Sequence, residues 1–286
     1  MKMVIKWSAI LIAGFALNAN AWIFTNGYPT YHGASRGVVD GTTTNIVGPG
    51  GQYEYIYGLN VGYQLIIESG STLTVASNGS LSVTYESFIG SASSGNRLVL
   101  QNGSHTTFGD DAYVGYSAGS NGNVLDIQRG ASVIFPTGSG LYVGTGGGTD
   151  NTLILGADID VHYSVTIRSG NTIIFDGGRI LDTASFYFYS GAVVEFTSGY
   201  NVGDVIVAAD NAASMNWTNI LAAFNAAGAA QGYEFELGNP TKTTGSNTLI
   251  VTAVPEPASA LMFILGAGFF GFYRRHLQIR QRKTRL

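Results

Sequence analysis

The sequence predicts a mostly β protein whose main body is a right-handed parallel β-solenoid. Three observations lead to this fold class. Short segments of alternating apolar residues recur along the chain, glycines stand between them at fixed positions, and strong helix formers are scarce over the same stretch. Because the segments recur every 25 to 29 residues, each unit is expected to bury its apolar face against its neighbours in a stack.

The repeat is clearest when Leu98, Leu125 and Leu153 are aligned. The stretches are "NRLVLQNGSHTTF" (96–108), "NVLDIQRGASVIF" (123–135) and "NTLILGADIDVHY" (151–163). All three begin with asparagine and carry apolar residues at offsets 2, 4 and 12. Alternation places the apolar side chains on one face of a strand, and the glycine at offset 7 of the first two allows a sharp corner. In the third stretch, Asp158 stands where the glycine is expected.

Further segments extend the repeat to three strands per unit. The apolar and glycine pattern recurs without the asparagine in residues 65–75, 165–175 and 186–196. A small strand precedes each of the three asparagine copies, as "FIG" (88–90) and "YVG" (113–115 and 142–144). An antiparallel β-sandwich is the alternative fold, because it also uses short alternating strands separated by frequent turns.

The two ends of such a stack need covering, because an open end exposes unpaired backbone groups. Residues 22–50 have no clear repeat and are expected to cap the amino end. The stretch 214–232 is predicted to form a helix over the other end, with Asn216 or Ser214 as its N-cap and Gly228 as its stop. The apolar side chains expected on one face of this helix are Trp217, Ile220, Leu221 and Phe224.

The first 21 residues have the three parts of a secretory signal peptide. Lys2 and Lys6 precede an apolar run from Trp7 to Leu17, and Ala19-Asn20-Ala21 is a small-x-small cleavage site. A short transmembrane anchor is the less favoured alternative, because the run is well below the roughly 20 residues that cross a bilayer. The exported body is therefore expected to span residues 22–253.

Charge and composition exclude several classes of partner and cofactor. The body contains six basic and seventeen acidic residues, a net charge of −11, and such a surface repels the phosphates of nucleic acid. The chain contains no cysteine, so disulfides and thiolate chemistry are excluded. Its four histidines are scattered along the sequence. We therefore expect no metal, no cofactor and no nucleic-acid partner.

Residues 254–286 combine a rigid tripeptide, an apolar stretch and a basic cluster. Pro255-Glu256-Pro257 precedes an uncharged stretch over 258–273, which is about 24 Å long as a helix and is expected to cross the membrane. The basic residues that follow are Arg274, Arg275, Arg280, Arg282, Lys283 and Arg285. By the positive-inside rule they keep the carboxyl terminus in the cytoplasm and leave the body outside.

In this order, the tripeptide, the apolar stretch and the basic cluster resemble the PEP-CTERM sorting signal of Gram-negative bacteria. The resemblance covers residues 254–286 and implies export through the secretion translocon to an inner-membrane intermediate. It further implies that exosortase, a membrane-embedded cysteine protease, removes the tail and passes the body to the cell surface or extracellular matrix. An ordinary single-pass membrane anchor is the alternative.

Parallel β-helices include polysaccharide lyases and glycosidases, which use grouped carboxylates. The candidate carboxylates are Asp110, Asp111, Asp126, Asp150, Asp158 and Asp160. Paired carboxylates bind Ca²⁺ or act as acid and base, but solvated turns and strand exteriors also account for these positions. We therefore predict no catalytic residues, with a polysaccharide-degrading enzyme as the alternative.

Aromatic side chains give the strongest indication of binding. The candidate sugar contacts are Tyr53, Tyr55, Tyr57, Tyr187 and Tyr189. The first three alternate along one predicted strand, and the last two alternate with Phe186 and Phe188, so an inward phenylalanine face places the tyrosines outside. Their rings suit either stacking on sugars or ordinary sheet packing. Together these features predict a structural or adhesive protein of the cell surface or exopolysaccharide matrix.

Overall fold

The computed structural model describes residues 64–253 apart from 69, 198, 211–215, 230 and 239–246, together with the strands at 36–39, 44–47 and 59–61. Four predictions lie outside these residues: the signal peptide at 1–21, the strand containing Tyr53, Tyr55 and Tyr57, the span at 258–273, and the remainder of the sorting segment at 254–286 with its basic cluster. No helix in the described ranges is long and apolar enough to cross a membrane.

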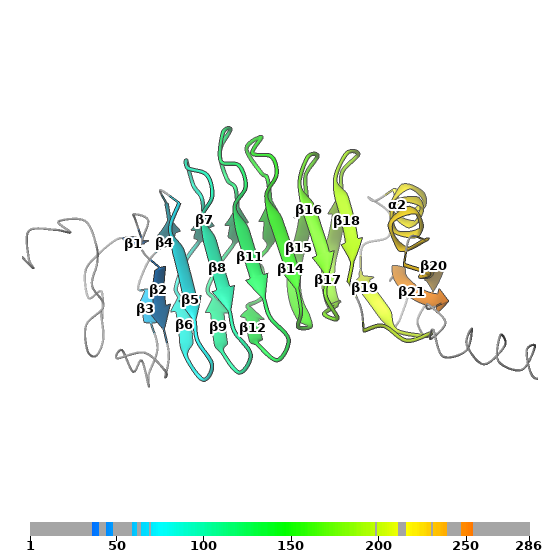
Figure 1. Cartoon of the computed structure of the whole chain (residues 1–286), viewed down its shortest axis with the longest axis horizontal. Coiled ribbons are helices and arrows are strands. Elements are labelled where there is room, and N and C mark those ends of the chain that lie inside the picture. The colour runs from blue at the N-terminus through cyan, green and yellow to red at the C-terminus, as the bar shows by residue number, and fades with distance from the viewer. Residues whose placement is uncertain are drawn as a thin grey trace, which may run out of the picture.

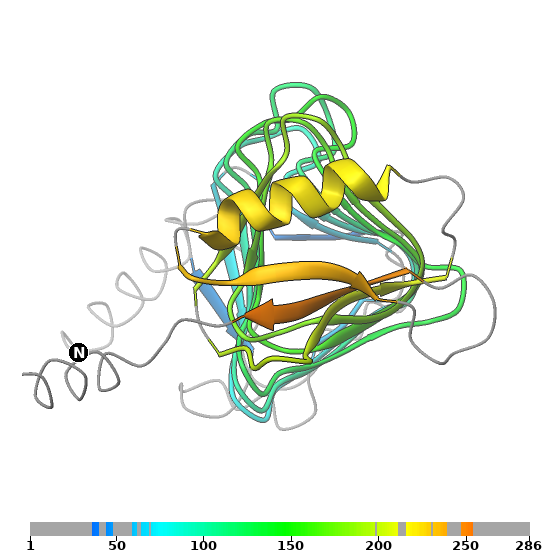
Figure 2. The same cartoon turned by 90° about the vertical axis from the view of Figure 1, so that its right-hand side faces the viewer.

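The described body is a β-solenoid of about six turns, seen from the side in Figure 1 and from its carboxyl end in Figure 2. Each complete turn contributes a strand to each of three faces. The first face comprises β1 (Arg36–Val39), β4 (Gln64–Ile67), β7 (Ser87–Ile89), β10 (Ala112–Val114), β13 (Leu141–Val143) and the second halves of β15 (Ile159–Ile167) and β17 (Ile180–Phe188).

The other two faces are built in the same way. The second face comprises β2 (Thr44–Val47), β5 (Thr72–Val75), β8 (Arg97–Leu100), β11 (Val124–Ile127), β14 (Thr152–Leu155), β16 (Thr172–Phe175) and β18 (Val193–Phe196). The third face comprises β3 (Leu59–Val61), β6 (Ser80–Val83), β9 (His105–Phe108), β12 (Ser132–Phe135), the first halves of β15 and β17, and β19 (Val205–Ala209). Because β15 and β17 each turn a corner, they join the first and third faces into one sheet.

Strand pairing between successive turns is parallel, which rules out the β-sandwich. Leu98 pairs with Leu125, and Leu125 pairs with Leu153, as the repeat predicts. The described strands pair antiparallel only at the carboxyl end, where β21 (Asn247–Ala253) lies between β19 and β20 (Glu234–Gly238). The parallel solenoid is therefore confirmed, whereas its right-handed sense stays a prediction.

The core is a set of columns of apolar side chains that run along the solenoid axis. One column on the second face contains Leu73, Leu98, Leu125, Leu153 and Ile173, all fully buried and in register from coil to coil. Burying a side chain of this size contributes roughly 1.5–3 kcal/mol. Since each coil covers the next, the columns form one continuous core.

Two different corners of the coil share the same glycine pattern. Gly103 and Gly130 lie between the second and third faces, whereas Gly70, Gly170 and Gly191 lie between the first and second. All five have a positive φ of 73–83°, which a side chain with a Cβ rarely adopts. The three stretches that lack the asparagine are therefore a second corner of the coil, not further copies of the first. A sharp bend between two alternating strands produces the same local pattern at either corner.

A column of buried asparagines runs beside the start of the second face. Its members are Asn96, Asn123, Asn151 and Asn171. The amide nitrogen of each of the first three donates to the amide oxygen of the next, at 2.8, 2.9 and 2.9 Å. The same oxygens also accept the backbone N–H of the preceding asparagine. The first three members are the asparagines that begin the aligned repeats, and the structure adds Asn171.

The helix α2 (Trp217–Ala229) lies across the carboxyl end of the solenoid, as Figure 2 shows. The Asn216 side chain accepts the N–H of Asn219 at 3.2 Å, so Asn216 is the N-cap. Phe224 packs into the core with its ring centroid 5.6 Å from those of Phe175 and Phe196. The predicted capping helix is confirmed.

Two details of the ends differ from the prediction. Gly228 does not stop α2 but lies within it, where a Cβ would come 2.6 Å from the Phe235 ring. The helix ends at Ala229, and Gly232 adopts the positive φ instead. At the amino end, β1 and β2 lie within residues 22–50 and pair parallel with β4 and β5, so part of this predicted cap forms a further rung. Both strands keep the 28-residue spacing to their partners, but Gly37 and Asn45 stand where the next coil has Leu65 and Leu73, so the apolar pattern is not visible in the sequence.

The inward and outward positions of β11 predict opposite results for two neighbouring substitutions. Leu125→Asp places a carboxylate inside the core and should cost more than about 3 kcal/mol of the free energy of unfolding. Asp126 lies on the opposite side of the strand, where its side chain is 9% exposed and accepts a 2.6 Å bond from the 45% exposed Arg97. Asp126→Leu leaves Arg97 hydrated and should cost less than about 2 kcal/mol. Urea unfolding compares the two, and equal losses would contradict the assigned faces.

The asparagine column predicts that Asn123→Ala destabilises the body beyond the loss of one contact. The substitution leaves the backbone N–H of buried Asn96 without its acceptor, and the Asn96 side-chain amide keeps only its bonds to Ser93. We expect the free energy of unfolding to fall by at least about 2 kcal/mol. Asn121→Ala is the matched control, because its side chain bonds Thr149 in an exposed loop. Unfolding curves of equal midpoint for the two variants would argue against a structural role of the column.

Candidate functional site: a tyrosine-lined groove on the first face

A column of aromatic rings follows the outside of the first face. Phe88, Tyr113 and Tyr142 occupy the central, outward position of β7, β10 and β13 and pair in register. Their ring centroids are 5.1 and 5.2 Å apart, with angles of 11° and 17° between the planes. Tyr116 packs edge-on against Phe88 and Tyr113. The outer surface of the sheet is therefore a stack of flat rings over three successive coils.

A groove of about 520 Å³ opens at the end of this column towards the carboxyl end of the solenoid. Its walls contain Tyr142, Tyr163, Tyr187 and Tyr189. The polar residues that line it are Thr145, Ser164, Thr166, Arg168 and Ser185. The strands β13, β15 and β17 bring these side chains together from three successive coils. The groove thus combines flat rings with hydroxyl groups and one positive charge.

The positive charge of Arg168 is held against an aromatic ring. Its guanidinium carbon lies 4.4 Å from the centroid of the Tyr189 ring, a cation–π contact. The Arg168 Nε and the Thr145 Oγ1 are both buried, and neither has a hydrogen-bond partner within the described residues. The half-buried Arg168 side chain is thus a charged group that lines the groove and is held in place by the Tyr189 ring.

The hydroxyls of Tyr113 and Tyr142 are neutral at ordinary pH. Burial, followed by the negative charge of Asp111, raises the pKa of Tyr142 to about 12. Burial also raises the pKa of Tyr113 above its usual range, and the Tyr113 hydroxyl donates to Asp111 at 2.8 Å. A neutral hydroxyl both donates and accepts hydrogen bonds. These tyrosines are therefore suited to non-covalent contacts with a polar ligand.

The structure confirms the predicted directions of the aromatic pairs on β17. Phe186 is fully buried and Phe188 packs against the core, while Tyr187 and Tyr189 line the groove outside. Their role as sugar contacts stays a prediction. Sequence reasoning missed Tyr142, Tyr163 and Arg168. The recurrence of an aromatic residue at the outward position of "FIG" and the two "YVG" strands is the signal that identifies Tyr142.

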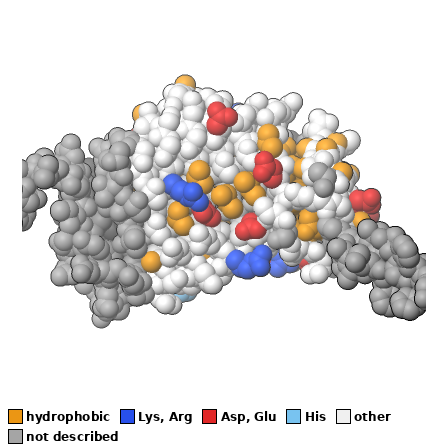
Figure 3. Space-filling model, in the orientation of Figure 1, with side chains coloured by type: hydrophobic (Ala, Val, Ile, Leu, Met, Phe, Trp, Pro, Cys, Tyr) orange, Lys and Arg blue, Asp and Glu red, His pale blue; other side chains and the backbone are white. Residues whose placement is uncertain are grey.

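The candidate carboxylates Asp111, Asp126 and Asp158 lie at separate points of the coil. Asp126 binds Arg97, and Asp111 accepts the backbone N–H of Gly140 at 2.7 Å. Asp158 accepts two bonds from Arg179, at 3.0 and 2.6 Å, which raise the pKa of that guanidinium. Among the described residues, no three His, Asp or Glu side chains gather as a metal site would require. Figure 3 shows the charged side chains scattered over one face.

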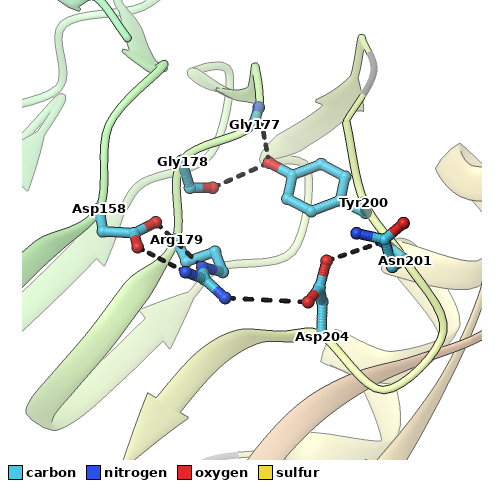
Figure 4. A network of polar contacts seen from close by, with 7 residues as sticks. All are labelled: Asp158, Gly177, Gly178, Arg179, Tyr200, Asn201 and Asp204. Atoms are coloured by element: carbon cyan, nitrogen blue, oxygen red, sulfur yellow. Dashed lines mark hydrogen bonds and ion pairs between the residues drawn. The ribbon is translucent and has the colours of Figure 1, made fainter. Parts of the chain in front are cut away.

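The Asp158–Arg179 pair belongs to a polar network between neighbouring turns (Figure 4). Arg179 also lies 3.9 Å from Asp204, which accepts the backbone N–H of Asn201. Beside this network, the buried Tyr200 hydroxyl accepts from the N–H of Gly177 and donates to the carbonyl of Gly178. These bonds join residues of successive turns, so the network fastens the last coils to the segment before β19.

The fold defines a parallel β-solenoid protein, and the groove gives it a candidate binding surface. Among protein-family models, the PEP-CTERM protein-sorting motif matches residues 253–280. No curated protein and no solved structure matches the chain. The chain therefore carries a PEP-CTERM sorting motif, as the tripeptide, the apolar stretch and the basic cluster predict. This motif indicates an exported surface protein that passes through the membrane and is processed by exosortase.

Proposed function

We propose that this chain is a structural or adhesive protein of the bacterial cell surface or exopolysaccharide matrix, and that it is not an enzyme. The observation that carries the proposal is the combination of a PEP-CTERM motif with a solenoid body whose outer face presents a tyrosine-lined groove. The motif directs the chain to the surface, and the groove offers a place for an exopolysaccharide to bind. The remaining partners are the secretion translocon and exosortase.

The stacked architecture supports a role as a fixed binding surface. Each coil is held by backbone pairing and by buried columns to the coils on either side, so the outer side chains keep a constant spacing. A preorganised surface loses little conformational freedom when a ligand binds. The ion pairs of Asp126 and Asp158 support the non-enzymatic assignment, because each carboxylate is engaged by its own arginine and the two pairs lie at separate points of the coil.

The sorting tail follows the folded body with almost no linker. The strand β21 ends at Ala253, and Val254 alone separates it from Pro255. We propose that the signal peptide at 1–21 is removed during export, while residues 258–273 hold the body at the inner membrane with the carboxyl terminus in the cytoplasm. Cleavage near the tripeptide then leaves β21 paired between β19 and β20, so the body keeps its fold when the tail is removed.

Replacing Pro255-Glu256-Pro257 with three alanines tests the sorting step in the native host. The change keeps the apolar stretch and the basic cluster, so the chain should still insert but should accumulate at full length in the membrane fraction. Mass spectrometry of the wild-type protein should find a mature carboxyl terminus near Pro257. Deletion of Arg274–Leu286 is the comparison, since it removes the stop-transfer charges and should weaken membrane retention. Intact Leu286 on most surface-exposed wild-type molecules would leave a plain membrane anchor.

A polysaccharide panel separates the adhesive role from the enzymatic alternative. Full-length protein in detergent is incubated with immobilised polysaccharides, and both retention of the protein and release of shortened sugar chains are scored. A binding protein should be retained by at least one polysaccharide without releasing products. Release of oligosaccharides that stops when Asp158 or Asp126 is changed to Asn would instead establish a polysaccharide-degrading enzyme.

A further inference from the structure

The aromatic column on the first face lacks one ring. Thr166 follows Phe88, Tyr113 and Tyr142 at the same outward position of the next coil, and Tyr187 follows Thr166. Neighbouring strands lie about 4.8 Å apart, so the strands that carry Tyr142 and Tyr187 are roughly 10 Å apart. The earlier rings fill one such step each, with centroids 5.1 and 5.2 Å apart. The threonine therefore leaves a slot of about one ring between two tyrosines.

The surroundings of this slot are polar. The hydroxyls of Ser164 and Thr166 are 3.1 Å apart beneath it, and both residues are buried. The Thr145 hydroxyl lines the same groove and, as described above, has no partner in the described part of the chain. A flat hydrocarbon offers no hydrogen bond to the hydroxyls around the slot. A ring that carries its own hydroxyls suits the slot, as a sugar does.

Arg168 adds a requirement for negative charge. Arg97 and Arg179 each form an ion pair with an aspartate, whereas Arg168 forms none with any described residue. Arg168 is also a lining residue of the groove, and it gives the groove a positive charge. The body carries an excess of acidic groups, yet this cation is kept on the Tyr189 ring. A guanidinium presents paired donors that match the two oxygens of a carboxylate.

We infer that the groove binds an acidic polysaccharide through one uronic acid unit. The sugar ring occupies the missing position of the column between Tyr142 and Tyr187, and its carboxylate pairs with Arg168. This inference rests on the proposed function and names its ligand class. Because the net charge of the body repels a polyanion at long range, recognition depends on these short-range contacts.

Calorimetric titration of the full-length protein in detergent with oligosaccharides of alginate, a polymer of uronic acids, tests the assignment. Dextran oligosaccharides provide the neutral comparison, and dextran sulfate tests for attraction to any polyanion. We expect alginate to bind more tightly than either. Arg168→Gln should weaken alginate binding by about tenfold or more, because it removes a charge-assisted pair. Arg129→Gln removes a cation at another corner of the coil and should leave the affinity unchanged.

Filling the slot provides a second and independent test. Thr166→Tyr supplies the missing ring, so alginate binding should be lost while the thermal midpoint stays the same or rises. The matched control is Thr107→Tyr, the same substitution at an outward position of β9 on the third face, which should bind alginate like the wild type. The retained midpoint separates loss of the slot from loss of the fold.

Each failure has a distinct meaning. Absence of alginate binding, or binding that neither Thr166→Tyr nor Arg168→Gln reduces, would overturn the assignment of the groove. Equal affinity for dextran sulfate would overturn the uronic acid and indicate general anion binding. None of these results affects the proposed surface location, which depends on cleavage of the tail. An uncleaved tail would overturn that location whatever the groove binds.

Discussion

The structure depends on backbone pairing between coils. A typical strand of this body is three or four residues long, too short to be stable by itself, and its N–H and C=O groups are satisfied only by the strands of the coils before and after it. In-register parallel pairing also places like residues above one another. The buried leucine column, the buried asparagine column and the outer aromatic column all follow from this one constraint.

A repeating cross-section raises the problem of its ends, where the last coil has no successor. At the carboxyl end, one element covers the exposed core and another pairs with the exposed strand. The helix α2 covers the core and brings Phe224 against four phenylalanines of the last coils, while β21 pairs antiparallel with β19. These elements break the parallel repeat, and so they limit the addition of further strands at that end.

The sequence predicts the features that depend on local alternation and misses those that depend on which coils become neighbours. Leucine spacing reveals the core columns, and the apolar stripe containing Phe224 reveals the cap. The glycine pattern does not distinguish one corner from another, because each sharp bend needs a residue with positive φ. The groove is only partly visible: Tyr187 is found by alternation, but Tyr163 reaches it from a corner of β15 where the strand register shifts between Val161 and Ser164.

Because of the asparagine column, the position of the second-face strands does not depend on the number of residues in a coil. Successive members are 27, 28 and 20 residues apart, yet each makes the same bonds to its neighbour. The loop before the second face can gain or lose residues without changing the strand register. The asparagine that follows the loop forms the same bonds and so sets that register. The loops that precede this column are therefore the part of the molecule that evolution or design can reshape without displacing the core or the tyrosines around it.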